Sequence, residues 1–197
     1  MSKKKASKVN RVFFAFVILA MTSASSRADI VQFSLAGAGG SGLLSTNIDP
    51  PTGEPGSGGL GDSGISFDTD TNILSVDVEW GSGNGFTDLS VDVFALHLHG
   101  PTADSHSAAW GQRAPLMIVL SESTAFNASR TDGGVDANYF LDSSQSAALL
   151  AGRTYINVHL SDTDTGMIRG YLAAVPEPGS GTILAGLGLL AVTRRRR

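Results

Sequence analysis

The stretch FALHLHGP, residues 94–101, predicts a buried β-strand that ends abruptly at its Gly-Pro pair. The expected core face of this strand consists of Phe94, Leu96 and Leu98. Successive side chains of a strand point to opposite faces, so His97 and His99 project together from the other face. Two of the four histidines in the protein therefore lie next to each other on one strand.

Alternating apolar and polar residues outline further strands on both sides of this stretch. Turns rich in Gly, Asp and Asn separate these strands. The expected strands are 30–35, 65–67, 73–80, 89–99, 116–120, 154–160 and 167–173. About seven short strands with turn signals between them predict an all-β fold, an antiparallel β-sandwich with Greek-key-like connections.

The segments between the strands contain one expected helix and two long loops. Gln145–Leu150 is predicted to be a short helix that the serine pair at 143–144 caps and Gly152 ends. Residues 37–64 are rich in Gly, Pro and Ser and are expected to form a long mobile loop. Residues 121–138 also have a loop-like composition.

Charged residues are distributed unevenly along the chain. The net charge of the protein is −4, but ten of its 14 basic residues lie in the first 27 or the last four positions. Residues 29–174 contain four arginines, no lysine and 17 acidic residues, a net charge of −13. Such a surface repels phosphate backbones, which argues against nucleic acid as a partner. The absence of cysteine excludes thiolate metal sites, thiol nucleophiles and disulfides.

The first 28 residues have the three parts of a secretory signal peptide. A basic segment precedes an apolar run at 12–21, and Ser26-Arg27-Ala28 places small residues at the −3 and −1 positions. The apolar run is short for a membrane-spanning helix, so we expect cleavage between Ala28 and Asp29 rather than an uncleaved anchor. This segment implies export through the Sec translocon and processing by signal peptidase.

The last 23 residues repeat this combination of apolar and basic segments in the reverse order. Val175-Pro176-Glu177-Pro178 precedes an apolar, Gly-rich run at 179–193, and four arginines end the chain. We expect the apolar run to form a short transmembrane helix with the arginines in the cytoplasm. A run of about 15 residues is short for a bilayer span and would anchor the chain only weakly. An ordinary tail anchor is the alternative.

The order Pro-Glu-Pro, short apolar helix and basic cluster resembles the PEP-CTERM sorting signal of Gram-negative bacteria. The resemblance implies recognition by an exosortase-type transpeptidase and removal of the helix. It also implies release or attachment at the cell surface, commonly in bacteria that make exopolysaccharide. The expected organisation is therefore a signal peptide at 1–28, one β-sandwich domain at 29–174 and a sorting signal at 175–197.

Several stretches of the β-sandwich segment resemble the CHRD domain, which was first described in chordin and is frequent in bacterial exported proteins. They are HLHGP at 97–101, AALLAG at 147–152, YINVH at 155–159 and GMIRG at 166–170. The resemblance spans roughly residues 30–174. It implies a β-sandwich and, in animals, extracellular binding to growth factors. It implies no established reaction.

The histidines form one candidate metal site. Copper and zinc accept a pair such as His97 and His99 on one strand face, and His159 is the obvious third ligand. If the strand of His159 lies beside that of His97, three imidazoles converge. The alternative is that these histidines only hydrogen-bond backbone carbonyls or carboxylates within the fold. Cofactors are therefore either none or a copper or zinc ion.

Arg169 is a second candidate, because it is one of only four arginines between residues 29 and 174. We expect it to form a salt bridge or to bind backbone carbonyls within the fold; the alternative is a carboxylate anchor for a ligand. The patterns Asp68-x-Asp70-x-Asn72 and Asp162-x-Asp164 alternate oxygen ligands as calcium sites do, but no bidentate Glu follows either pattern. Turn chemistry therefore explains both patterns better.

The sequence favours a non-enzymatic exported module. Nucleophile-elbow, phosphate-loop and zinc-protease motifs are all missing from the sequence. We expect a protein that is transiently anchored in the inner membrane and then reaches the cell surface or the extracellular matrix. There it would bind or scaffold exopolysaccharide or a surface protein. The alternative is a metal-binding protein or a copper-type redox enzyme that uses His97, His99 and His159.

Overall fold

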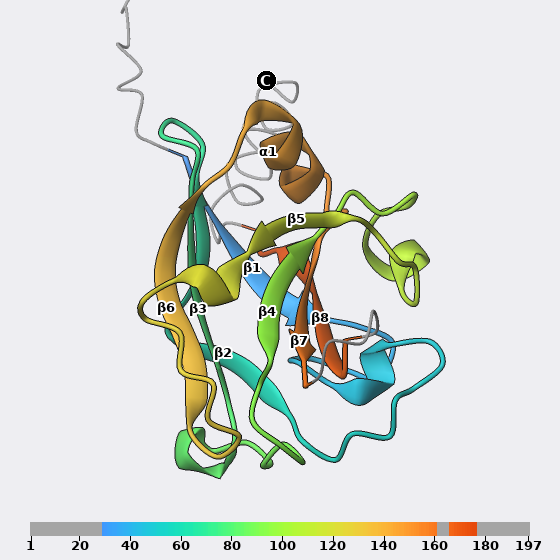
Figure 1. Cartoon of the computed structure of the whole chain (residues 1–197). Helices are drawn as coiled ribbons and strands as arrows, with labels where there is room; N and C mark the ends of the chain where they lie inside the picture. Colours follow the sequence, from blue (N-terminus) through green and yellow to red (C-terminus); the bar gives the residue numbers. More distant parts are fainter. Residues whose placement is uncertain (1–28, 161–165, 177–197) are drawn as a thin grey trace, which may run out of the picture.

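The computed structural model describes residues 29–160 and 166–176 (Figure 1). The predictions for the signal peptide, the Asp162-x-Asp164 turn, and the chain from Glu177 onward, including Pro178 and the apolar helix, lie outside the described residues. Within the described part, no helix combines the length and the apolar character that a membrane crossing requires.

The described residues form eight β-strands and one α-helix, which confirms the predicted all-β class with a single short helix. The strands are β1 (Ile30–Ala36), β2 (Gly58–Asp68), β3 (Ile73–Trp80), β4 (Ala95–His99), β5 (Leu116–Val119), β6 (Gly133–Phe140), β7 (Tyr155–His159) and β8 (Ile168–Ala174). The helix is α1 (Ser143–Leu150). Four short 3-10 helices lie in the connections, η1 (Ser45–Asn47), η2 (Ser82–Asn84), η3 (His106–Ala109) and η4 (Leu120–Glu122).

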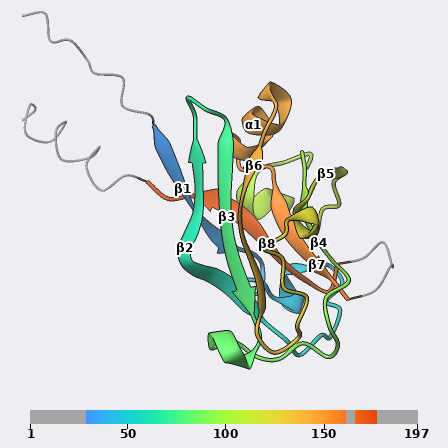
Figure 2. The ribbon, with the colours of Figure 1, turned by 60° about the vertical axis from the view of Figure 1, so that its left-hand side comes forward.

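All eight strands belong to one antiparallel sheet in the order β5-β4-β7-β8-β1-β2-β3-β6. Strand β1 pairs with β8 on one side and with β2 on the other, which joins the two halves of the sheet. The sheet curls (Figures 1 and 2), and the main core contains side chains from both halves. A single curled sheet thus encloses the core that the predicted sandwich would enclose between two layers.

The main core follows from the alternation of the strands. Phe33 and Leu35 of β1 are buried, as are Leu74, Val76, Val78 and Trp80, which alternate along β3. The indole N–H of Trp80 donates to the carbonyl of Ser129 at 2.7 Å, so this large side chain is buried without an unpaired polar atom. Leu96 and Leu98 of β4 complete the expected pattern.

The loop-like prediction for residues 121–138 was wrong in its second half. Residues from Gly133 onward form β6, which pairs with β3 along its whole length. Val135, Ala137 and Tyr139 alternate with polar residues in this strand, but the adjacent Gly-Gly, Asp and Asn suggest a turn. The pairing with β3 outweighs these weak strand propensities.

The long loop predicted for residues 37–64 is shorter and better anchored than expected. Strand β2 already begins at Gly58. The side-chain amide of Asn47, which is 1% exposed, donates to the carbonyls of Gly42 and Arg169 at 3.1 and 2.9 Å. The buried carboxylate of Glu54 accepts hydrogen bonds from the backbone N–H and the hydroxyl of Ser90. These bonds hold the segment against the sheet.

Two smaller predictions also need correction. The central strand predicted at 89–99 is regular only from Ala95, and Phe94, expected in the core, is 62% exposed. Phe94 donates its backbone N–H to the carbonyl of His159, the last residue of β7, so it lies at the end of the strand pairing. Helix α1 begins with a capping box of Asp142 and Gln145 rather than with a serine cap, and Gly152 adopts a positive φ just beyond its end.

Candidate metal centre

Strand β7 has covered faces on both sides, and all five of its residues are buried. Its inner side chains, Ile156 and Val158, belong to the main core. Its outer side chains lie on a second face that β4, β7 and β8 share, which we call the polar face. By the strand register, the polar face consists of His97, His99, Tyr155, Asn157, His159, Arg169 and Tyr171.

Two connecting segments cover the polar face. The β4–β5 connection contacts it through the backbone of Ala114, whose N–H donates to the Tyr155 hydroxyl at 3.0 Å. The segment before β2 contacts it through Leu44, which bridges to Arg169. Ala109 packs with Tyr155 and Tyr171 into a small second core. The polar face is therefore largely enclosed rather than open to water.

The pairing of β4 with β7 brings the three predicted histidines together. His97 lies opposite Asn157 and Ala95 lies opposite His159, so His159 is the diagonal neighbour of His97. The ring centroids of His97 and His159 are 4.6 Å apart, and one potential ligand nitrogen from each of the three histidines lies within 4.8 Å of the other two. The strand of His159 thus lies beside that of His97, which is the arrangement that lets the three imidazoles converge.

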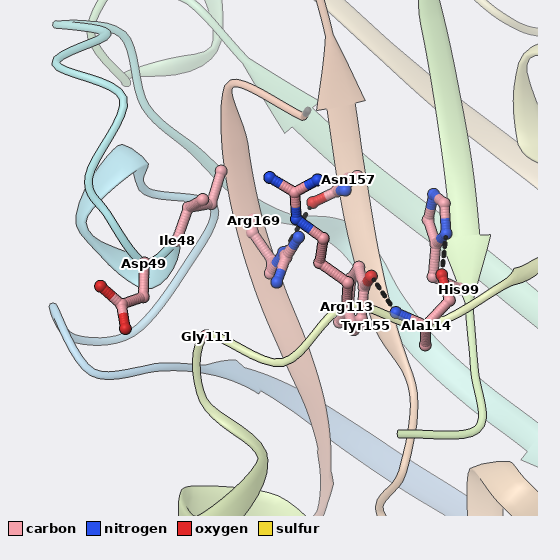
Figure 3. A pocket seen from close by; sticks show the side chains of 9 residues that line it. All are labelled: Ile48, Asp49, His99, Gly111, Arg113, Ala114, Tyr155, Asn157 and Arg169. Atoms are coloured by element: carbon pink, nitrogen blue, oxygen red, sulfur yellow. Dashed lines mark hydrogen bonds between the residues drawn. The ribbon is translucent and has the colours of Figure 1, made fainter. Parts of the chain in front are cut away.

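A hydrogen bond fixes the tautomer of His99. Its Nδ1 lies 3.0 Å from the carbonyl oxygen of Ala114, which can only accept, so the proton is on Nδ1 (Figure 3). The Nε2 atom then carries a free lone pair. It is buried and has no hydrogen-bond partner among the described residues. A histidine whose other ring nitrogen donates to a carbonyl is typical of a metal ligand.

Burial keeps the two histidines of β4 neutral. Loss of solvation lowers the pKa of both His97 and His99 from the ordinary value of 6.5. Repulsion by the Arg169 guanidinium, and by His97 whenever it is protonated, lowers the pKa of His99 further, whereas hydrogen bonds to the backbone of Ala114 and Pro115 raise it. Neutral imidazole is the form that binds metal, so the pKa shifts favour coordination at neutral pH.

The three nitrogens fit the first coordination shell of zinc or copper. Ligand nitrogens at about 2.1 Å from a tetrahedral ion lie about 3.4 Å apart. The three histidine nitrogens lie within 4.8 Å of one another, so small side-chain rotations would bring them to this spacing. Three protein ligands leave a further coordination position for water or another small ligand. The described residues contain no other group of three or more histidines and acids with this spacing.

Tyr155 supports His99, a role that no motif in the sequence predicts. Its ring stacks on the His99 ring with centroids 5.1 Å apart and an interplanar angle of 9°. Its hydroxyl accepts from the Ala114 N–H while His99 donates to the Ala114 carbonyl, so the backbone of one residue orients both rings. The only sequence signal was the period-two spacing that places Tyr155 on the same strand face as His159.

Arg169 donates hydrogen bonds to neutral acceptors within the fold. It is 4% exposed. Its Nε donates to Asn157 Oδ1 at 2.8 Å, and one terminal nitrogen donates to the Gln112 carbonyl at 3.0 Å and the Tyr171 hydroxyl at 3.2 Å. Its guanidinium carbon lies 3.9 Å from the centre of the Tyr155 ring. Among the described residues, Arg169 contacts no acidic side chain.

A cavity of about 190 Å³ opens beside His99 and Arg169. Figure 3 shows Asp49 on one side of this cavity and His99 on the other. The complete lining is Ile48, Asp49, His99, Gly111, Arg113, Ala114, Tyr155, Asn157 and Arg169.

The acidic pattern at Asp68 is a turn, as its composition favoured. One carboxylate oxygen of Asp68 accepts the backbone N–H groups of Asp70 and Thr71 at 2.9 and 3.1 Å. These bonds lower the pKa of Asp68, with the Thr71 bond as the largest cause. This is the hydrogen-bond pattern of an Asx turn, in which an Asp side chain bonds to the backbone that follows it.

Comparison with protein families gives two matches along the chain. The CHRD domain model matches residues 32–172, and the model of the PEP-CTERM protein-sorting motif matches residues 174–197. Both resemblances stated from the sequence are therefore confirmed. Searches among curated proteins and among solved structures give no match.

Proposed function

Because the chain belongs to the CHRD domain family, we propose that its β domain is a non-enzymatic binding module at the surface of the cell that exports it. The PEP-CTERM motif at 174–197 supports export and sorting by an exosortase. On this proposal the mature protein is deposited at the cell surface or in the extracellular matrix after removal of its terminal segments.

We assign the binding role of this module to the three-histidine cluster, with a copper(II) or zinc ion as the ligand. The observation that carries this assignment is the convergence of His97, His99 and His159 on the polar face, with ligand nitrogens within 4.8 Å. The buried lone pair of His99 Nε2 supports it, because burial of an unsatisfied nitrogen is costly unless something binds there. The orienting bond to Ala114 supports it as well.

The net charge of the domain also favours a metal cation as the ligand. Residues 29–174 carry a net charge of −13, so the field of the domain attracts cations from the surrounding medium. The imidazole nitrogens then provide the selectivity, because copper and zinc prefer nitrogen ligands whereas calcium and magnesium prefer oxygen.

The test is metal binding by the full-length protein purified in detergent and stripped with a chelator. Calorimetric titration with zinc and with copper(II) should give one ion per chain. Single substitutions His97→Ala, His99→Ala and His159→Ala should each lower the affinity by about 100-fold or more, because two ligands hold an ion far more weakly than three.

The matched control is His106→Ala, since His106 lies in η3 and outside β4 and β7. This variant should retain one ion per chain with unchanged affinity. Binding that survives all three strand variants, or the lack of stoichiometric uptake by the unmodified protein, would exclude the metal assignment. Turnover of a reductant by the copper-loaded protein would favour the alternative of a redox enzyme.

A further inference from the structure

We propose that the cavity beside His99 is a second binding site, for a small singly charged carboxylate. It lies next to the metal cluster but is lined by neither His97 nor His159. The inference does not rest on the proposed metal function, because its key residues are two arginines.

Two of the few positively charged side chains of the domain lie at this cavity. The domain contains only four arginines and no lysine against 17 acidic residues between positions 29 and 174. Two of the four, Arg113 and Arg169, line this one cavity. Both side chains extend into the same space beside Asn157 (Figure 3). Two guanidinium groups at such a position repel each other, and an anion bound between them would offset this repulsion.

Neither of these two arginines pairs with an acidic side chain among the described residues. Arg169 is buried and donates only to neutral acceptors, which leave its charge uncompensated. Arg113 is exposed, and among the described residues its side chain forms no hydrogen bond or ion pair. Its guanidinium therefore has all its donors available for a ligand.

The size and the rim of the cavity define the ligand class. About 190 Å³ is below the range of about 300–1,000 Å³ that drug-sized ligands occupy, so the ligand is small. The planar guanidinium fork matches a carboxylate or a phosphate in bidentate geometry. The exposed carboxylate of Asp49 lines the other side of the cavity and repels a second negative charge. This combination favours a monocarboxylate over phosphate.

The experiment uses L-lactate as the probe, with lactamide as the uncharged analogue and inorganic phosphate as the competing oxyanion. Binding to the full-length, chelator-stripped protein is followed by ligand-observed NMR. Lactate should bind saturably, and lactamide and phosphate should bind at least about tenfold more weakly, since each lacks the charge or the fit.

Arg113→Gln is the decisive variant, because this exposed side chain contributes no bond to the fold. It should raise the dissociation constant of lactate about tenfold or more at an unchanged melting temperature. Arg130→Gln is the matched control, since Arg130 is also an exposed arginine but lies outside the cavity, and it should leave lactate binding unchanged. Equal affinity in Arg113→Gln, equal binding of lactamide, tighter binding of phosphate, or no saturable binding of lactate would each overturn the proposal.

Discussion

At the residue scale, His99 links the chemistry of the polar face to the fold. Its Nδ1–H donates to the Ala114 carbonyl, which leaves Nε2 as a buried acceptor. The spacing of His97 and His99 could be read from the sequence, because strand geometry fixes it. The bond to Ala114 could not, because it joins residues whose contact depends on the path of the β4–β5 connection.

The lowered pKa values of His97 and His99 predict a pH dependence for the metal-free protein. The folded-state pKa of each lies below the ordinary 6.5, so the unfolded chain binds these protons more readily. The contribution of the two histidines to the free energy of unfolding is complete above pH 6.5. It is lost as the pH falls below 6.5 toward their folded-state pKa values. The free energy of unfolding, measured by urea titration, should therefore decline with acidification in this window.

His97→Gln with His99→Gln provides the comparison for this effect. The double variant should show a flatter stability profile below pH 6.5. The lowered carboxyl pKa of Asp68 does not interfere, because its effect begins only near the ordinary Asp value of 3.8. Parallel profiles for the variant and the unmodified protein would mean that these histidines titrate equally in the folded and unfolded states.

At the element scale, the pairing of β4 with β7 creates the candidate site. These strands are separated by more than 50 residues in sequence but lie side by side, with five pairs of residues opposite each other. The histidine-bearing strands and helix α1 could be predicted, because alternation and the helix-ending Gly152 are local signals. Strand β6 could not, since only its pairing with β3 makes the GGVDANYF segment extended.

Tyr155 of β7 holds the β4–β5 connection over the polar face, and removal of its hydroxyl tests this role. Tyr155→Phe leaves the Ala114 N–H without its acceptor and should cost about 1 kcal/mol of stability. Because Ala114 also orients His99, the affinity for zinc should fall about tenfold. Chemical denaturation and calorimetric titration measure the two effects.

Tyr139→Phe is the matched control for this prediction. The Tyr139 hydroxyl also makes one hydrogen bond to the backbone, to the Leu120 carbonyl at 2.7 Å, but Tyr139 lies on β6 and away from the polar face. Its removal should lower stability by a similar amount without any change in zinc affinity. A Tyr155→Phe protein that binds zinc as tightly as Tyr139→Phe would contradict the positioning role of Tyr155.

At the scale of the whole molecule, the chain combines an acidic β domain with basic terminal segments. Ten of its 14 basic residues lie at the two ends, which the sequence reveals directly. The antiparallel all-β class was also predictable from the strand pattern, but the continuous curl through β1 was not. That curl depends on β1 pairing with both β2 and β8, which are distant in sequence.

Sorting by the C-terminal segment predicts a change of location when that segment is removed. A chain that ends at Ala174 lacks the motif matched at 174–197 and should appear in the soluble exported fraction instead of the membrane and surface fractions. Fractionation of the exporting cells with antibody detection measures this. An unchanged distribution of the shortened chain would contradict exosortase-dependent sorting.

The proposed metal-binding role of the domain is tested most directly by identifying the atoms that coordinate a bound ion. X-ray absorption at the zinc edge, on the full-length protein loaded with one zinc per chain, measures the identity and distance of the ligands. We expect three imidazole nitrogens at about 2.0–2.1 Å from the zinc and one further light ligand. A shell of oxygen ligands without imidazole scattering would contradict it.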